Sequence, residues 1–330
     1  MIDLNRRTFL GASAALAGTA ALAQSETKPA SLAGKSVLIT GCSSGFGKLA
    51  AQRCAERGAR VFATMRNLGA GAKMRAEGQE LMDLAARNKW GGFSVLDLDV
   101  TKEKQVALAV AKAEQMAGGG LDAVINNAGI GMGGPVELAD VEAMQMIMDT
   151  NLYGYLRVAR ASLPAMRKRK QGLVISVSSQ LGRIVVPGLG IYGGTKFAVE
   201  CMFETMAYEL APHGVEVTII QPGGYPTNIW KSASENTQAM LARQSVEAQT
   251  AYARLVESAS NRAGGGSTDP NDVARAMADL VAMSPGTRPL RRPVHPETRA
   301  TDAVNAACAQ VQGAVLGSGP YADWHKAVAT

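Results

Sequence analysis

The chain has 330 residues, of which 47% are hydrophobic, and its formal net charge at pH 7 is +6. This length and this apolar fraction are those of a globular protein with one large domain or two small ones. The basic excess is modest and spread along the chain, so it does not indicate a nucleic-acid-binding protein.

The first residues have the pattern of an export signal. Arg6 and Arg7 precede a stretch of small and apolar residues, 10–23, that is too short for a stable membrane span. We therefore expect residues 1–23 to be a twin-arginine-type signal peptide, read by the twin-arginine (Tat) export machinery, and residues 24–34 to be a polar linker. The protein would then be periplasmic, or cytoplasmic if the signal is not used.

A short buried strand at 36–39 leads into a glycine-rich turn, and an amphipathic helix follows to about Arg57. Glycines between a strand and a helix let the backbone approach a pyrophosphate at the helix N-terminus. The sequence therefore predicts a nucleotide site in this turn. The residues expected to contact the nucleotide are Gly41, Ser43, Ser44, Gly45, Phe46 and Gly47.

The second strand, 60–64, is followed by Arg66, and no acidic residue lies between Glu56 and Glu77. Folds that prefer NAD place an acidic residue at this strand end to hold the ribose 2′-hydroxyl. A guanidinium instead matches the oxygens of a 2′-phosphate. The pattern favours NADP(H) over NAD(H), although Arg66 could also be a solvated loop residue.

Two further strands, 92–98 and 121–125, end in short polar segments. Asp99 either contacts the adenine or caps a helix that starts at Thr101, and the two roles are compatible. Small and amide residues after the second of these strands allow the backbone to approach a ribose. The cofactor contacts expected here are Asp99, Val100, Asn127, Ala128 and Gly129.

A long helix is predicted from about residue 141 to 167, and it contains Asn151. Asparagine has a poor helix propensity, which indicates a local kink or a polar role at this position.

The stretch 172–200 brings hydroxyl, phenol and ammonium groups to one strand end. An apolar run, 173–177, predicts a buried strand that ends at Ser178 and Ser179. Tyr192 and Lys196 are four residues apart, so they share one face of the following helix. The sequence predicts a proton-transfer site made of Ser179, Tyr192 and Lys196.

The last third of the chain begins with another buried strand, 215–221, which is followed by Pro222, Gly223 and Thr227. Residues 228–268 form an insertion of the size and position of a substrate lid. Asp269-Pro270 starts a helix, and 290–294 is an edge strand because its prolines exclude a central position. Residues 297–330 form a C-terminal extension to which the sequence assigns no role.

Strands and helices alternate through residues 35–296, which predicts one α/β domain of the Rossmann type. In this fold a doubly wound parallel sheet, here of about seven strands, carries helices on both faces. The four cysteines match no metal-binding spacing, and no metal is expected. They are Cys42, Cys54, Cys201 and Cys308, for which free and mostly buried thiols are favoured over disulfides.

Together these motifs resemble the short-chain dehydrogenase/reductase family, in its single-domain branch, and most of all its hydroxysteroid and retinol dehydrogenases. The resemblance implies that Tyr192 is the general acid and base and that the charge of Lys196 lowers the pKa of its phenol. It also implies that Lys196 holds the nicotinamide ribose, that Ser179 holds the substrate oxygen and that Asn151 positions a water. Pro222, Gly223 and Thr227 would contact the nicotinamide. A homo-dimer or homo-tetramer is a further family expectation.

These features lead to the hypothesis of an NADP(H)-dependent oxidoreductase. The residues expected near the substrate are mostly apolar, which favours an apolar ketone or secondary alcohol. These residues are Gln180, Val186, Tyr225 and Trp230. The alternatives are a non-catalytic NADP(H)-binding sensor or scaffold and a different activity on the same fold, such as epimerisation or dehydration.

Overall fold

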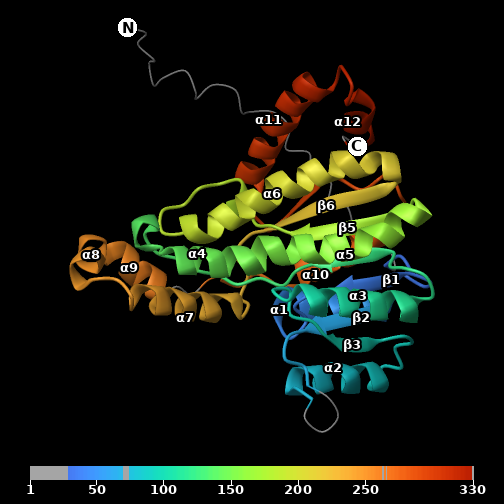
Figure 1. The fold of residues 1–330 in the computed structure, drawn as a ribbon, viewed down its shortest axis with the longest axis horizontal. Coiled ribbons are helices and arrows are strands. Elements are labelled where there is room, and N and C mark those ends of the chain that lie inside the picture. Colours follow the sequence, from blue (N-terminus) through green and yellow to red (C-terminus); the bar gives the residue numbers. More distant parts are fainter. Residues whose placement is uncertain (1–28, 70–73, 262–263, 265, 329–330) are drawn as a thin grey trace, which may run out of the picture.

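The computed structural model describes residues 29–69, 74–261, 264 and 266–328. Its centre is a seven-stranded parallel sheet with strand order β3-β2-β1-β4-β5-β6-β7, covered by helices on both faces (Figure 1). The predicted fold class is therefore confirmed. The strands are β1 Ser36–Ile39, β2 Arg60–Met65, β3 Ser94–Asp97, β4 Ala123–Asn126, β5 Gly172–Val177, β6 Val215–Pro222 and β7 Arg291–Val294.

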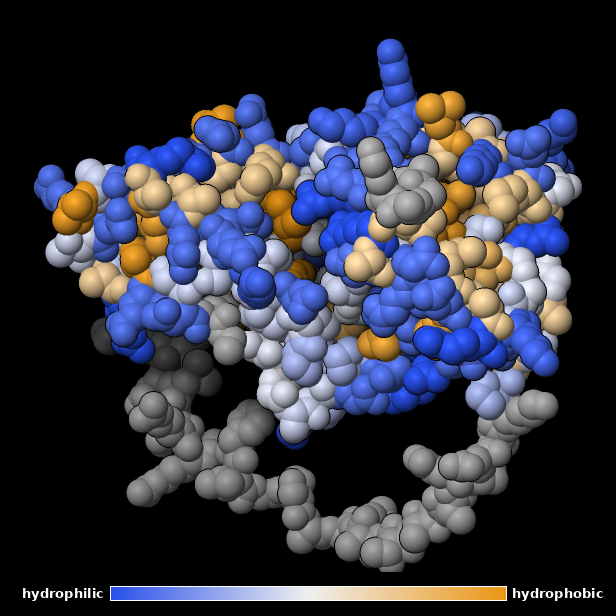
Figure 2. All heavy atoms as spheres, turned by 90° about the horizontal axis from the view of Figure 1, so that it is seen from below, coloured by the Kyte–Doolittle hydropathy of each residue, from blue (hydrophilic) through white to orange (hydrophobic). Residues whose placement is uncertain are grey.

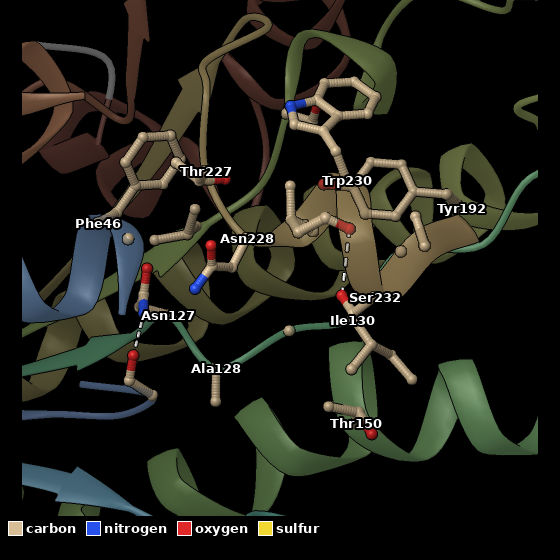
Figure 3. Close-up of a pocket in the computed structure, with 18 of the residues that line it drawn as sticks. Phe46, Asn127, Ala128, Ile130, Thr150, Tyr192, Thr227, Asn228, Trp230 and Ser232 are labelled. Atoms are coloured by element: carbon tan, nitrogen blue, oxygen red, sulfur yellow. Dashed lines mark hydrogen bonds between the residues drawn. The ribbon is translucent and has the colours of Figure 1, made fainter. Parts of the chain in front are cut away.

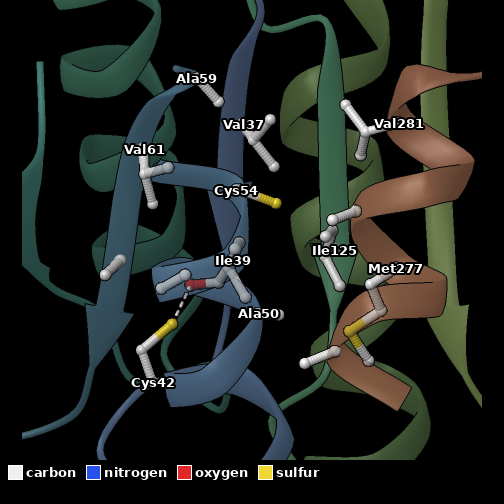
Figure 4. Packing of buried hydrophobic residues seen from close by; sticks show 14 of the residues in the cluster. Val37, Ile39, Cys42, Ala50, Cys54, Ala59, Val61, Ile125, Met277 and Val281 are labelled. Carbon is white, nitrogen blue, oxygen red and sulfur yellow. Dashed lines mark hydrogen bonds between the residues drawn. The ribbon is translucent and has the colours of Figure 1, made fainter. Parts of the chain in front are cut away.

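Successive residues of each strand point to opposite faces of the sheet, which divides the core in two. Val37 and Ile39 of β1 pack with helices α1 (Gly45–Glu56) and α10 (Asn271–Ala282) on one face (Figure 4). Leu38, which lies between them in the strand, packs on the other face. The first face is covered by α1 Gly45–Glu56, α2 Ala76–Arg87 and α10 Asn271–Ala282, and the second by α3 Glu103–Ala117, α5 Gly154–Arg169 and α6 Gly190–Leu210.

The order of the strands reverses beside β1. From there β2 and β3 extend the sheet in one direction, and β4 to β7 extend it in the other. All strands are parallel, so their carboxyl ends share one edge, and a crevice opens where the order reverses. The predicted edge strand is confirmed, since β7, which contains Pro293, lies at the end of the sheet.

The helix predicted over 141–167 is interrupted at its predicted weak point. It consists of α4 Val141–Met148, a π-helical turn η3 Asp149–Tyr153, and α5. Helical structure over this range is therefore confirmed, and of the two alternatives for Asn151, a local kink or a polar role, the hydrogen bonds of its side chain support the polar role. The Asn151 side chain bonds to another segment of the chain, and π-turns are frequent where side chains have such duties.

The predicted lid consists of three helices, α7 Ile229–Leu241, α8 Val246–Ala251 and α9 Ala253–Ser260. A third apolar cluster joins α7 to α4 and to the short turn η2 Val136–Leu138. Two hydrogen bonds dock α7 on the segment after β4: Asn236 Nδ2 donates to Gly131 O (3.0 Å), and Gly133 N donates to Thr237 Oγ1 (2.9 Å).

Two boundaries differ from the predictions. Residues 1–23, the predicted signal, lie outside the described residues, but the end of the predicted linker belongs to the fold. Leu32 is fully buried, and its N–H donates to Arg57 O. Burial of its apolar side chain removes that side chain from water and so favours its packing in the core. The helix predicted from Thr101 starts at Glu103 instead, and Asp99 caps only the preceding turn by accepting from Thr101 N and Oγ1.

The chain ends in α11 Arg299–Leu316 and α12 Ala322–Val328, which lie on the side of the molecule that carries α6 (Figure 1). In α11, Thr301 is the buried residue, and α12 packs against α6 through the stacked rings of Tyr208 and His325. The predicted C-terminal extension is therefore attached to the domain.

The four cysteines are free, as predicted. Cys42 and Cys54 are buried beside β1, Cys308 is half-buried and Cys201 is exposed, so the thiols are less uniformly buried than expected. On the face seen in Figure 2, hydrophobic residues form separate patches among hydrophilic ones. Within the described ranges, no helix has the length and apolarity that a membrane span requires.

Candidate active site

A cavity of about 660 Å³ opens at the carboxyl ends of the strands, where the sheet reverses its order. Figure 3 shows its walls, with Phe46 and Asn127 near one end and Tyr192 and Trp230 near the other. All the predicted cofactor residues line this cavity except Gly47, which lies beneath its floor. The lining ones are Gly41, Ser43, Ser44, Gly45, Phe46, Arg66, Asp99, Val100, Asn127, Ala128, Gly129, Tyr192, Lys196, Pro222, Gly223 and Thr227.

The glycine turn is packed too closely for side chains. A Cβ on Gly47 would lie 2.4 Å from both Gly41 O and Asn127 Nδ2, and Gly41 itself has a φ of +73°. These contacts let α1 begin directly at the cavity floor, so its first N–H groups face the cavity. In the described chain no side chain caps this helix and no acid lies in its first turn. A helix start of this kind can bind an anion.

Thr40, which sequence reasoning missed, ties the glycine turn to the segment after β4. Its Oγ1 accepts from Asn127 N (2.9 Å) and Ala128 N (3.0 Å), while Asn127 Nδ2 donates to Thr40 O (2.8 Å). The side-chain amide of Asn127 is therefore used in a bond within the protein, and the segment 127–129 contributes its backbone to the cavity wall. The sequence signal for this role was the position of Thr40, whose hydroxyl comes directly after the buried strand β1.

Two arginines stand at the β2 end of the cavity. Arg66 is exposed and lines the cavity wall there. Arg75 lines the same wall. Sequence reasoning missed Arg75 because nine residues separate it from Arg66. Arg75 Nη1 donates to Arg66 O (3.2 Å), and its Nε and Nη2 bind both carboxylate oxygens of Glu77 at 2.9 Å. This pairing raises the pKa of Arg75 and lowers that of Glu77.

Ser179, Tyr192 and Lys196 meet at the middle of the cavity, as the sequence predicts. Ser179 follows β5, and its Oγ accepts from Leu181 N (3.1 Å) and donates to Pro222 O (3.4 Å). The Lys196 Nζ lies 5.6 Å from the centre of the Tyr192 ring and donates to Val177 O (2.8 Å).

Tyr155, a buried residue of α5 that sequence reasoning missed, also contacts the lysine. Its OH accepts from Lys196 Nζ at 3.5 Å and donates to Val177 O at 3.1 Å. It fixes the lysine from behind. No sequence pattern marks this residue, because it comes from a helix 41 residues away.

Burial governs the ionisation of both central groups. It raises the pKa of Tyr192 to about 12, which a hydrogen bond with Ser179 opposes, and it lowers the pKa of Lys196 to about 7, which the charge of Glu200 opposes. The expectation that Lys196 lowers the pKa of Tyr192 was therefore wrong for the protein without ligands. Desolvation of the phenolate sets the direction of this shift, and the charge of Lys196 is not among its causes.

Asn151 is fully buried and does not line the cavity. Its Nδ2 donates to Ile130 O (2.9 Å) and Thr195 Oγ1 (3.1 Å), and its Oδ1 accepts from Ile130 N (2.9 Å). Both amide hydrogens are thus used within the protein. In this structure Asn151 connects the cavity wall at Ile130 to the helix that carries Lys196.

The predicted substrate residues divide into two groups. Val186 and Gln180 lie at the cavity wall, and Gln180 is anchored by a bond from its Nε2 to Glu297 O (2.8 Å). Trp230 lies over the cavity and donates from Nε1 to Tyr225 O (2.7 Å). Tyr225 also lines the cavity, but it is only 2% exposed and its ring packs edge-on against Phe46, so most of it lies in the core.

The substrate end of the cavity is mostly apolar, with a few uncharged polar side chains such as Gln180, Asn228 and Ser232. The charged residues of the lining are Arg66, Arg75 and Asp99 at the glycine-turn side and Lys196 at the centre. In the described part of the chain, no group of three or more His, Cys, Asp or Glu side chains could hold a metal ion. The arrangement suits proton transfer to or from an uncharged group held beside Tyr192.

Comparison with known proteins agrees with this arrangement. Residues 35–238 match the sequence model of the family described as short chain dehydrogenase. A 3-ketodihydrosphingosine reductase of Bacteroides thetaiotaomicron is 38% identical over 193 residues, which are 58% of this chain and 64% of that protein. Retinol dehydrogenase 8 of Bos taurus is 36% identical over 192 residues, 57% of this chain and 58% of that protein. The chain thus spans less than two thirds of either relative.

Two solved structures show the same architecture. A metagenomic short-chain oxidoreductase in complex with NADP has a TM-score of 0.60 at 25% identity and covers 81% of this chain and 99% of its own. A 3-ketoacyl-(acyl-carrier-protein) reductase from Brucella melitensis complexed with NADH has a TM-score of 0.61 at 25% identity and covers 80% of this chain and 98% of its own.

Proposed function

The chain belongs to the short-chain dehydrogenase family, and we propose that it is an NADP(H)-dependent oxidoreductase acting on an apolar ketone or secondary alcohol. One observation carries the proposal: Ser179, Tyr192 and Lys196 meet inside a cavity that begins at an uncapped, glycine-lined helix start. An anion site and a proton-transfer site in one cavity are the two parts that nicotinamide chemistry requires.

The residues present fit a dinucleotide with a 2′-phosphate. The N–H groups at the start of α1 would bind the pyrophosphate, and the missing Cβ atoms at Gly41 and Gly47 allow the turn to pack closely on itself and on residues 127–128 beside this helix start. Arg66 would bind the 2′-phosphate, since β2 is followed by no acidic residue before Glu77 that could hold a free hydroxyl. Lys196 would hold the nicotinamide ribose and Thr227 the carboxamide. When bound, the nicotinamide would supply or accept the hydride.

Tyr192 would transfer the proton. Because burial raises its pKa to about 12, the phenol is protonated at neutral pH and ready to donate to a carbonyl oxygen. Ser179, at the end of β5, would also bind that carbonyl oxygen, since its hydroxyl lies within hydrogen-bonding distance of the Tyr192 phenol. In the oxidative direction Tyr192 must lose its proton, which requires a positive Lys196 beside it.

The substrate class follows from the wall of the cavity. Beyond Lys196 the lining is made of side chains such as Ile130, Met132, Leu189 and Ile229, with no charged group among the described lining residues. Burial of apolar surface would supply most of the binding free energy. A carboxylated or phosphorylated substrate would find no partner there.

The location of the protein follows from its first residues. We propose export by the twin-arginine route, on the grounds of Arg6, Arg7 and the short apolar stretch after them. Replacing both arginines by lysine should keep the full-length precursor in the cytoplasm. Equal amounts of periplasmic protein from the wild type and the variant would contradict this assignment.

The proposed function is tested by cofactor titration and turnover. NADPH and NADH are titrated against the wild type, Arg66→Ala and the control Arg87→Ala, whose arginine is exposed and outside the cavity. A lost charge-assisted bond to phosphate is worth about 1.5–3 kcal/mol, so Arg66→Ala should weaken NADPH binding roughly 10- to 100-fold and leave NADH binding unchanged. Equal affinity of the wild type for both cofactors would refute the NADP(H) assignment.

Turnover is measured on a panel of apolar ketones. Tyr192→Phe should lower kcat by about 10²- to 10⁴-fold, the usual contribution of a positioned acid, without weakening NADPH binding. Tight NADPH binding with no turnover of any carbonyl or alcohol would instead support a non-catalytic NADP(H)-binding protein.

A further inference from the structure

Four charged side chains, of which Glu200 is buried and the other three are partly buried, lie together behind the catalytic residues. Glu200 and Glu204 come from α6, Arg183 follows the short turn η4 Gln180–Gly182, and Arg291 comes from β7. Arg291 Nε donates to Glu200 Oε2 (2.9 Å), and Arg183 Nε lies 3.3 Å from the same oxygen. Arg291 also pairs with Glu204. The side chain of Glu200 is only 3% exposed.

The C-terminal helix α11 joins this cluster through an amide pair. Asn305 Nδ2 donates to Gln221 Oε1 (2.7 Å), and Gln221 Nε2 donates back to Asn305 Oδ1 (3.3 Å). The same Nε2 donates to Glu200 Oε1 (2.8 Å). Gln221 is fully buried, so water does not bind its side-chain amide. Asn305, which donates to Gln221 Oε1, therefore orients the amide of Gln221 so that its Nε2 points toward Glu200.

Two of these residues, Glu200 and Gln221, adjoin catalytic groups along the chain. Glu200 lies one helical turn after Lys196 on α6, as Lys196 lies one turn after Tyr192. Gln221 precedes Pro222, whose carbonyl accepts the hydrogen bond of Ser179 Oγ.

The turn η4, which leads from Ser179 to Arg183, is pressed against the same turn of α6. A Cβ on Gly182 would lie 3.0 Å from Glu200 Cγ and 3.1 Å from Lys196 O. The cluster therefore fixes η4 and β6 against the turn of α6 that carries the lysine. A buried ion pair of this kind is a poor source of stability but a demanding constraint on geometry.

We propose that Asn305 and Glu200 are positioning residues for the reaction, and that α11 completes the active site by holding Gln221 and Glu200 behind Ser179, Tyr192 and Lys196. This inference rests on the proposed function. No residue of α11 lines the cavity among the described residues, so the helix acts on the reaction through these contacts and leaves the cofactor site untouched. Misplacement of reacting groups by about 1 Å can lower a rate by about 10²-fold.

The test compares Asn305→Ala with Gln310→Ala, a matched substitution of an exposed residue on the same helix. Asn305→Ala removes the donor to Gln221 Oε1 and one of the two acceptors of Gln221 Nε2, and it leaves the bond from Nε2 to Glu200 in place. It should lower kcat at least 10-fold while the dissociation constant of NADPH stays within threefold of the wild type. Gln310→Ala should leave both unchanged. Asn305→Asp is a second variant of the same shape; it places an oxygen against Gln221 Oε1 and should lower kcat at least as much.

Three results would overturn the proposal. In the first, kcat of both Asn305 variants stays within twofold of the wild type. In the second, kcat and NADPH affinity fall together with the melting temperature, which is what a merely structural helix would produce. In the third, Gln310→Ala has the same effect as Asn305→Ala.

A measurement without turnover separates this proposal from the proposed function. If the wild type reduces no carbonyl compound, the proposed function fails, and hydrogen exchange still reports the coupling. Asn305→Ala should then increase amide exchange in residues 179–183 and 190–200 relative to Gln310→Ala. Unchanged exchange in both segments would refute the coupling.

Discussion

Replacing Asn151 by alanine should destabilise the protein more than any change at its exposed neighbours. The side chain is fully buried and makes three hydrogen bonds, two with the backbone of Ile130 and one with Thr195 Oγ1. At about 1 kcal/mol for each bond, Asn151→Ala should lower the free energy of unfolding by roughly 3 kcal/mol. At about 2–4 °C per kcal/mol, the melting temperature should fall by roughly 6–12 °C.

The assay is thermal unfolding followed by circular dichroism, with Thr150→Ala as the control. Thr150 lies in the same π-helical turn, but its hydroxyl makes a single bond of 3.3 Å to Met146 O near the surface. Its loss should change the free energy of unfolding by less than about 1 kcal/mol. If the two variants differ by less than about 1 kcal/mol, Asn151 does not hold the turn in the way we infer.

Three further outcomes are expected. Gly47→Ala should weaken NADPH binding more than 10-fold, because the added Cβ would lie 2.4 Å from the backbone oxygen of Gly41 and would displace the glycine turn. Gly91→Ala is the control and should have no effect, because the space around Gly91 is open. Equal NADPH titration curves for the two variants would contradict the role of the glycine turn in binding the cofactor. Tyr192→Phe should lower the free energy of unfolding at pH 8 by no more than about 1 kcal/mol, since the hydroxyl that is lost makes one hydrogen bond, with Ser179, and chemical denaturation measures this. Burial lowers the folded-state pKa of Lys196 from 10.5 to about 7, so the unfolded state binds more protons between these values, and this group makes the stability rise with pH. Lys196→Met should therefore remove part of the increase in the free energy of unfolding between pH 7 and pH 10, and parallel curves for the two proteins would show that the lysine is not buried as described.

The fold could be predicted from the sequence because each of its strands and helices has a local sequence pattern. Short β-branched runs alternate with amphipathic helices, and this alternation leaves few topologies besides a parallel sheet covered on both faces. Glycines between a strand and a helix mark the dinucleotide turn, and the four-residue spacing of Tyr192 and Lys196 places them on one helical face. Each of these signals lies within one element or one connection.

What the sequence could not show depends on contacts between distant segments. Gln221 and Asn305 are 84 residues apart, and Asn151 and Thr195 are 44 apart, so the partners of these amides are set by how helices and strands pack. The ionisation of Tyr192 was predicted in the wrong direction for the same reason. The sequence shows a lysine nearby, but only the packed structure shows that both groups are desolvated, which raises the pKa of the phenol and lowers that of the lysine.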